Sequence, residues 1–272
     1  MDDSRVDTLA RTILTATRDV SPIDRIARDD APFDLADAYA VSRRIAEIRR
    51  GEGERIVGWK IGFTNRAIWD EYDVHAPIWG PMYDRTVFEV DPDSPAFVPV
   101  DAFSEPRIEP EIAFRLKRTP HPAMDTAELL GCVDGVAHGF EVVQSVFAGW
   151  KFAAADTIAA CALHGRYLCG PFAPVDDERT WLARLDDFVV RLYRDGEEVD
   201  EGHAHTVLGG PLHALSHFVR GLADTPFPPG LKPGHVVTTG TVTRAFPVSA
   251  GETWRSEIAG LPLPGLTLTI DR

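Results

Sequence analysis

The chain is organised around one stretch, Glu105-Pro106-Arg107-Ile108-Glu109-Pro110-Glu111-Ile112-Ala113-Phe114-Arg115-Leu116. Its tail, residues 112–116, is apolar or alternating and predicts a β-strand, with two prolines on its N-terminal side. On a strand, the i, i+2 spacing of Glu109 and Glu111 puts both carboxylates on one face, roughly 6.5–7 Å apart. Two acids aimed at one point repel each other unless a proton or a cation lies between them.

A hard divalent metal would explain this pair, because Mg²⁺ and Mn²⁺ take oxygen ligands. The alternative is that a local twist turns one glutamate to solvent and that neither binds anything. A third acid, Glu141, stands inside the apolar run Phe140-Glu141-Val142-Val143. A carboxylate in such a run is normally paired or ligates a metal.

Composition bounds the class of protein. The chain has 272 residues, 44% of them hydrophobic and 26% charged, which is ordinary for a globular protein with a sizeable core. The net charge of −14 argues against nucleic acid or an anionic membrane as the main partner. Three cysteines without metal-ligand spacing, and an N-terminus without a signal-peptide profile, lead us to expect a cytoplasmic protein with reduced thiols.

Helical and strand patterns alternate irregularly along the chain. Helices are predicted at residues 3–18, 34–50, 65–72, 126–137 and 211–222, and residues 19–32 form a connector. Strands are predicted at residues 56–63, 86–90, 97–100, 139–143, 166–168, 188–193, 235–241, 253–258 and 266–270. Residues 75–84 are predicted to be a turn-rich loop and residues 171–186 an acidic surface segment. Many short strands with few helices between them predict an α+β protein with a rolled or barrel-like sheet.

Lys60 is unusual because it lies within the apolar run Ile56-Val57-Gly58-Trp59-Lys60-Ile61-Gly62-Phe63. In one interpretation it reaches the surface from an edge strand. In the other it is a partly desolvated amine that donates to an anionic substrate or moves protons.

Six motifs in order resemble the 2-keto-4-pentenoate hydratase / 4-oxalocrotonate decarboxylase group of the fumarylacetoacetate hydrolase superfamily. The resemblance runs from about Tyr39 to the C-terminus. The motifs are Gly58-Trp59-Lys60-Ile61-Gly62-Phe63-Thr64, Glu109-Pro110-Glu111-Ile112-Ala113-Phe114, Phe140-Glu141-Val142-Val143, Asp156-Thr157-Ile158-Ala159, Leu208-Gly209-Gly210-Pro211-Leu212 and Thr239-Gly240-Thr241.

The resemblance implies a mixed β-roll core of the fumarylacetoacetate hydrolase C-terminal type at residues 56–272, with an N-terminal helical subdomain at residues 1–55. It implies that one Mg²⁺ or Mn²⁺ is bound by Glu109, Glu111 and Glu141. We expect the catalytic residues to be Lys60, His164 and Lys151. We expect the substrate-binding residues to be Gly62, Trp79, Asp156 and Thr241.

Two segments depart from the family pattern. Where the group usually has Asp-Asn-Ala-Ser, this chain has Ala160-Cys161-Ala162-Leu163, followed by His164, and the loop at residues 77–80 lacks an acid after its proline. His164 is either a replacement acid/base or structural. Lys151 and Asp156 either form an ion pair that shapes the pocket or are solvated charges.

These features predict a metal-dependent hydratase that adds water to a 2-hydroxy-2,4-dienoate or 2-oxo-enoate in aromatic-compound catabolism. The alternatives are decarboxylation of a 4-oxalocrotonate-type acid, C–C hydrolysis of an acylpyruvate, or a non-catalytic partner subunit. A homo-oligomer is expected, with a companion decarboxylase or aldolase as a further partner.

Overall fold

The computed structural model describes residues 1–272 except 29–32, 73 and 226. Its helices are α1 (Asp3–Arg18), α2 (Leu35–Gly51), α3 (Trp69–Tyr72), α4 (Thr126–Leu130), α5 (Ala154–Ala159), α6 (Glu178–Asp186) and α7 (Pro211–Asp224). The strands are β1 (Ile56–Gly62), β2 (Ile78–Tyr83), β3 (Val87–Glu89), β4 (Ala96–Pro99), β5 (Arg107–Leu116), β6 (Val133–Val143), β7 (His164–Cys169), β8 (Ala173–Pro174), β9 (Val189–Arg194), β10 (Glu197–His203), β11 (Val236–Thr241), β12 (Phe246–Pro247), β13 (Thr253–Ala259) and β14 (Thr267–Asp271).

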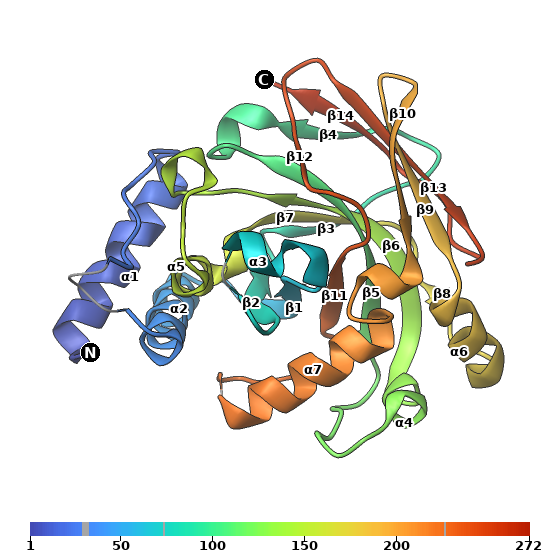
Figure 1. Ribbon diagram of the computed structural model, residues 1–272, viewed down its shortest axis with the longest axis horizontal. Coiled ribbons are helices and arrows are strands. Elements are labelled where there is room, and N and C mark those ends of the chain that lie inside the picture. Colours follow the sequence, from blue (N-terminus) through green and yellow to red (C-terminus); the bar gives the residue numbers. More distant parts are fainter. Residues whose placement is uncertain (29–32, 73, 226) are drawn as a thin grey trace.

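Within the described residues the strands form two mixed sheets (Figure 1). The nine-stranded sheet runs β2-β1-β11-β5-β6-β7-β3, with β12 paired to β5 and β8 to β6, and the five-stranded sheet runs β10-β9-β13-β14-β4. Most neighbours are antiparallel, but β1 and β11 are parallel. This curled arrangement of mixed strands confirms the predicted α+β fold with a rolled sheet.

Alternation along β5 and β6 separates an apolar face from a polar one. Ile108, Phe140 and Val142 are fully buried and pack with residues of the five-stranded sheet, including Trp254. The odd-numbered neighbours on these strands point to the other face, because successive side chains of a strand alternate. That second face carries the glutamates of the 105–116 stretch.

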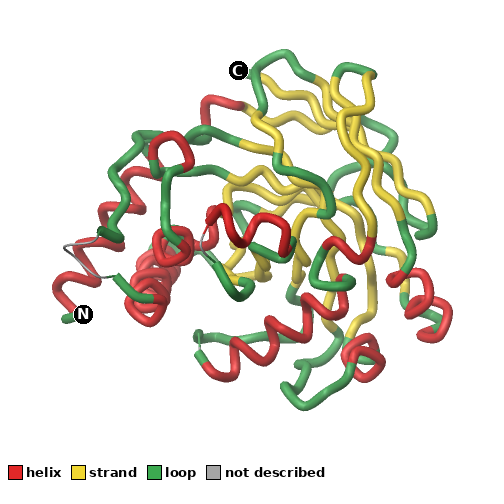
Figure 2. The backbone as a smooth tube through the Cα atoms, viewed as in Figure 1, coloured by secondary structure: helices red, strands yellow, loops and turns green. Residues whose placement is uncertain are grey.

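The helices lie around the sheets rather than between every pair of strands (Figure 2). α1, α2 and α5 gather at one end of the molecule, and α7 lies along the nine-stranded sheet (Figure 1). Asp2 and Asp34 cap the first two helices with their side chains, so the predicted starts are close to the observed ones. The expected connector at residues 19–32 is described only to residue 28. None of the helices that the structure describes has the length and apolar character needed to cross a bilayer.

Three predicted elements were wrong. Residues 78–83 are not a loop but strand β2; it is an edge strand, where Pro81 can sit without a backbone donor. The helix predicted at residues 126–137 ends at Leu130, and β6 begins at Val133, where Val133 and Val136 favour a strand and Gly135 disfavours a helix. The acidic segment at residues 171–186 contains α6, which buries Trp181 and Leu185.

Candidate metal centre and the cavity above it

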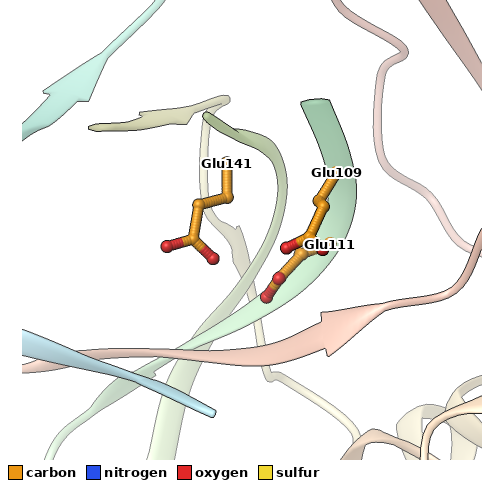
Figure 3. Close-up of side chains that lie close together, drawn as sticks. All are labelled: Glu109, Glu111 and Glu141. Atoms are coloured by element: carbon orange, nitrogen blue, oxygen red, sulfur yellow. The ribbon is translucent and has the colours of Figure 1, made fainter. Parts of the chain in front are cut away.

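Strand register brings three glutamates together. Glu109 and Glu111 lie on the same face of β5, and Glu109 pairs directly with Glu141 on β6. One carboxylate oxygen from each lies within 4.8 Å of the other two. Figure 3 shows the three side chains converging from the two neighbouring strands. Glu141 joins Glu109 and Glu111 because of the register between β5 and β6. No local sequence pattern encodes this register.

These carboxylates are buried with incomplete pairing. Glu111 and Glu141 are 1% and 0% exposed, and Glu109 is half-buried. Within the described residues, Glu111 Oε1 accepts no hydrogen bond. Glu141 Oε2 lies 3.1 Å from Lys60 Nζ, but the geometry of this contact is not that of a hydrogen bond. Burial, together with the Glu141 carboxylate, raises the pKa of Glu109 and of Glu111. Buried oxygens without donors, gathered around one point, fit a hard divalent cation such as Mg²⁺ or Mn²⁺.

A bulge in β11 holds Glu111. The register of β11 against β5 shifts between Thr238 and Thr241, and Gly240 occupies the shift with φ +92°. Its backbone N–H donates to Glu111 Oε2 at 2.8 Å. A Cβ on Gly240 would lie 1.9 Å from Thr64 Oγ1, so this position requires glycine.

Lys60 lies at the bottom of the same site. β1 has neighbours on both sides, and Lys60 is 4% exposed, so its side chain does not reach the surface from an edge. Its Nζ is 3.1 Å from Glu141 Oε2 and 4.0 Å from Glu109 Oε2. Burial alone would lower the pKa of Lys60, but the surrounding carboxylates outweigh burial and raise it. The amine is therefore cationic in this environment.

His164 holds Glu141 from the other side. Its Nδ1 is 2.8 Å from Glu141 Oε1, and its Nε2 is 2.8 Å from Thr86 Oγ1. Burial lowers the pKa of His164 although Glu141 opposes this shift. A histidine that hydrogen-bonds both a carboxylate and a hydroxyl fixes the carboxylate's orientation. Sequence reasoning missed Thr86, which carried no signal beyond a threonine at a strand start.

A cavity of about 640 Å³, including its solvent-open mouth, lies above the carboxylates. Gly62 and Thr241, two of the predicted substrate-binding residues, line it together with Lys60, Glu109 and Glu111. Lining residues that were not predicted include Ile78, Arg107, Val143, Trp150, Phe152 and Leu163. Arg107 was within reach of prediction, because it shares the i, i+2 face of the two glutamates.

Three predicted site residues lie elsewhere. Trp79 is buried in the core, with its ring stacked on Tyr39 at 4.9 Å, because its neighbour Ile78 takes the cavity side of β2. Asp156 is fully buried, and its oxygens accept from the amides of Ile26, Ala27 and Ala153 at 2.8–2.9 Å. Lys151 is exposed and is not part of the cavity lining, so it does not pair with Asp156.

Comparison with known proteins gives concordant matches. Residues 82–266 match the family model described as fumarylacetoacetate (FAA) hydrolase C-terminal. The 2-hydroxyhexa-2,4-dienoate hydratase of Comamonas testosteroni is 28% identical over 96% of both chains. The 4-oxalocrotonate decarboxylase of Pseudomonas sp. (strain CF600) is 30% identical over 93% of this chain and 92% of its own. The structure of 4-oxalocrotonate decarboxylase from Pseudomonas putida G7, complexed with magnesium and adipate, superposes with a TM-score of 0.90 at 26% identity, covering 99% of this chain and 98% of that one.

Proposed function

Because the chain belongs to the fumarylacetoacetate hydrolase family, we propose that it is a divalent-metal-dependent hydro-lyase of aromatic-compound catabolism. It adds water to a 2-hydroxy-2,4-dienoate or 2-oxo-enoate and gives a 4-hydroxy-2-oxo acid. One observation carries the proposal: two buried carboxylates, a third that is half-buried, and a buried lysine converge at the floor of a cavity that is open to solvent.

Glu109, Glu111 and Glu141 would hold the metal. When bound, the dication would supply positive charge to the carboxylate and keto oxygens of a 2-oxo acid. His164 and the Gly240 amide keep Glu141 and Glu111 oriented, so the ligand set is held before any substrate arrives.

Lys60 supplies the nearest positive charge of the chain itself. Its ammonium touches Glu141 and faces the cavity from which a substrate would enter. We assign it the role of balancing negative charge that develops on the C2 oxygen and of moving a proton there. Ketonisation of a 2-hydroxydienoate and protonation of the carbon skeleton both need such a group.

Decarboxylation is the second candidate, favoured by a specific similarity. A 4-oxalocrotonate decarboxylase is 30% identical over most of both chains, and the structure of another superposes at a TM-score of 0.90. The two segments that depart from the family pattern place Ile78 and Leu163 in the cavity, where polar groups for activating water are expected in a hydratase. The three glutamates and Lys60 can serve both reactions, because in each reaction negative charge develops on the C2 oxygen of the 2-oxo acid.

Substrate assays with Mg²⁺ separate the candidates. A 2-hydroxy-2,4-dienoate that loses its ultraviolet absorbance without release of CO₂ identifies a hydratase. Release of CO₂ from a 4-oxalocrotonate-type acid, without hydration of the monoacid, would replace the hydratase by the decarboxylase. Cleavage to pyruvate would identify a C–C hydrolase. Metal binding without turnover of any of these acids would favour a non-catalytic partner subunit.

We also propose that the chain acts in the cytoplasm as a homo-oligomer, with a companion decarboxylase or aldolase as a further partner. Three buried free cysteines are compatible with a reducing compartment. Phe97, which is 62% exposed on the edge strand β4, is a candidate contact between copies. Light scattering of the purified protein tests the oligomer, and a monomer at micromolar concentration would reject it.

A further inference from the structure

The cavity wall contains a strained turn. Cys161, Ala162 and Leu163 all have positive φ, at 53°, 55° and 63°. Residues other than glycine rarely adopt this conformation, and a run of three is unfavourable at each position. The turn packs against Gly80 of β2, where a Cβ would lie 2.3 Å from the Cys161 carbonyl oxygen. Strain of this kind persists where the surrounding structure enforces it, and it clusters at functional sites.

The turn places Ala162 and Leu163 in the cavity, beside other apolar side chains. Val143 follows the metal-site residue Glu141 by two positions on β6, and Ile78 pairs with Gly62, which follows Lys60 by two positions on β1. Both therefore lie one step of roughly 6.5–7 Å from the carboxylate floor, on the same face of the sheet. Phe152 completes this wall. The cavity therefore has charged side chains at its base, and apolar side chains, including Val143 and Ile78, line its wall one step further out.

Charge on the cavity lining matches one anionic group. Glu109, Glu111 and Lys60 line the cavity, and Glu141 lies directly behind them, 3.1 Å from Lys60. These four groups carry a formal charge of −2, which one divalent cation would neutralise. Arg107 remains. Its guanidinium stacks on the Trp150 ring at 3.9 Å, and within the described part of the chain no carboxylate forms an ion pair with it. The loaded site would thus carry one net positive charge, which a single substrate carboxylate balances.

From this wall and this charge we infer that the site selects monocarboxylic 2-oxo or 2-hydroxydienoic acids with an apolar carbon tail, and that Leu163 excludes acids with a second carboxylate. The inference rests on the proposed function and names its substrate class. A distal carboxylate that lies against Ile78 and Leu163 would lose its water and gain no donor from these two side chains.

Binding of two matched ligands tests this without turnover. Isothermal titration calorimetry of the Mg²⁺-loaded protein compares 2-oxohexanoate with 2-oxohexanedioate, which has the same carbon number and one more carboxylate. We expect the monoacid to bind at least about tenfold more tightly, since the diacid must bury an unpaired charge. This comparison uses the unaltered protein and does not depend on the folding of any variant.

Two variants locate the effect. Leu163→Arg should reduce the monoacid preference by at least about tenfold, and the milder Leu163→Ser should reduce it by a smaller factor. Leu35→Arg adds the same charge at a residue that is 50% exposed and should leave the preference unchanged. An unchanged preference in both Leu163 variants would remove this residue from the selection and overturn its assignment.

Other outcomes are also decisive. Equal or tighter binding of the diacid would overturn the inference while leaving the proposed function intact. If Arg107→Leu then abolished that diacid binding, Arg107 would be the partner of a second carboxylate. Binding of neither acid in the presence of Mg²⁺ would reject the proposed function, and the inference would fall with it.

Discussion

Glu111→Gln is the sharpest test of the metal centre, because it changes a charge and little else. Glutamine has the same shape, and its side-chain oxygen can still accept from the Gly240 amide as Glu111 Oε2 does at 2.8 Å. The Oε1 atom, which has no hydrogen-bond donor among the described residues, is replaced by an amide that cannot ligate through nitrogen. The fold should survive, and metal affinity should not.

The size of the effect follows from the site's geometry. A carboxylate and a dication with charge centres ~4 Å apart attract by about 8 kcal/mol at an effective dielectric constant of ~20. Burial and the Glu141 carboxylate raise the pKa of Glu111, so protonation competes with metal binding and the net effect is smaller than this attraction. We expect a net loss of at least about 3 kcal/mol, or about 100-fold in the Kd for the metal.

Titration of the metal-free protein with Mn²⁺, followed by electron paramagnetic resonance, measures this Kd directly. Glu89→Gln is the matched control, because Glu89 is an exposed glutamate on strand β3 of the same sheet. It should bind Mn²⁺ like the unaltered protein. An unchanged Kd in Glu111→Gln, with unchanged turnover, would refute the assignment of the three glutamates as metal ligands.

Four further predictions test the surrounding residues. Lys60→Ala should lower kcat by at least about 100-fold while the Kd for Mg²⁺ stays the same or falls, since a competing cation is removed; weaker metal binding would instead make Lys60 a structural residue. Gly240→Ala should weaken Mn²⁺ binding measured as above, because its Cβ has no space and the bulge amide must move; unchanged binding would show that the bulge does not position the ligand. Asp156→Asn should cost about 2–3 kcal/mol of unfolding free energy in urea, because one amide acceptor is lost and a donor faces a donor, with little change in KM; a large rise in KM with intact stability would restore its predicted role in substrate binding. Burial lowers the pKa of His138 to about 4. As the pH falls below about 6.5, the imidazole is therefore protonated in the unfolded chain before it is protonated in the folded protein. The free energy of unfolding should fall by about 2 kcal/mol between pH 7 and pH 5 through this group. His138→Gln should lose correspondingly less in urea unfolding at the two pH values, and an identical pH dependence would contradict this.

Local pattern predicted the parts of the site that depend on a single strand. The spacing of Glu109 and Glu111 fixed their common face, and the apolar neighbours of Glu141 predicted its burial. The pairing of Glu109 with Glu141 joins strands separated by a helix and two loops. Such long-range register is decided by the packing of both sheets, and only the family resemblance indicated it from the sequence.

The misplaced residues have local causes. Once residues 78–83 are taken as a loop, nothing determines which side chain faces the cavity, and the large aromatic Trp79 is chosen over Ile78. For Asp156 a signal was present, because an acid at the third position of a helix commonly accepts from the backbone at the helix start. Its motif instead suggested a role at the substrate.

The arrangement of the site separates metal binding from substrate choice. The three glutamates and Lys60 occupy one level of the sheet face. Val143 lies one step further along β6, and Ile78 of β2 lies opposite Gly62, one step further along β1. Substitution in the Cys161–Leu163 turn therefore changes what the cavity accepts, while the hydrogen bonds that hold Glu111 and Glu141 come from β11 and from His164. The chain can therefore depart from its family at residues 160–163 and still keep a complete carboxylate cluster. The same carboxylates and Lys60 can then serve hydration or decarboxylation. The apolar residues further along the cavity decide which of the two reactions follows.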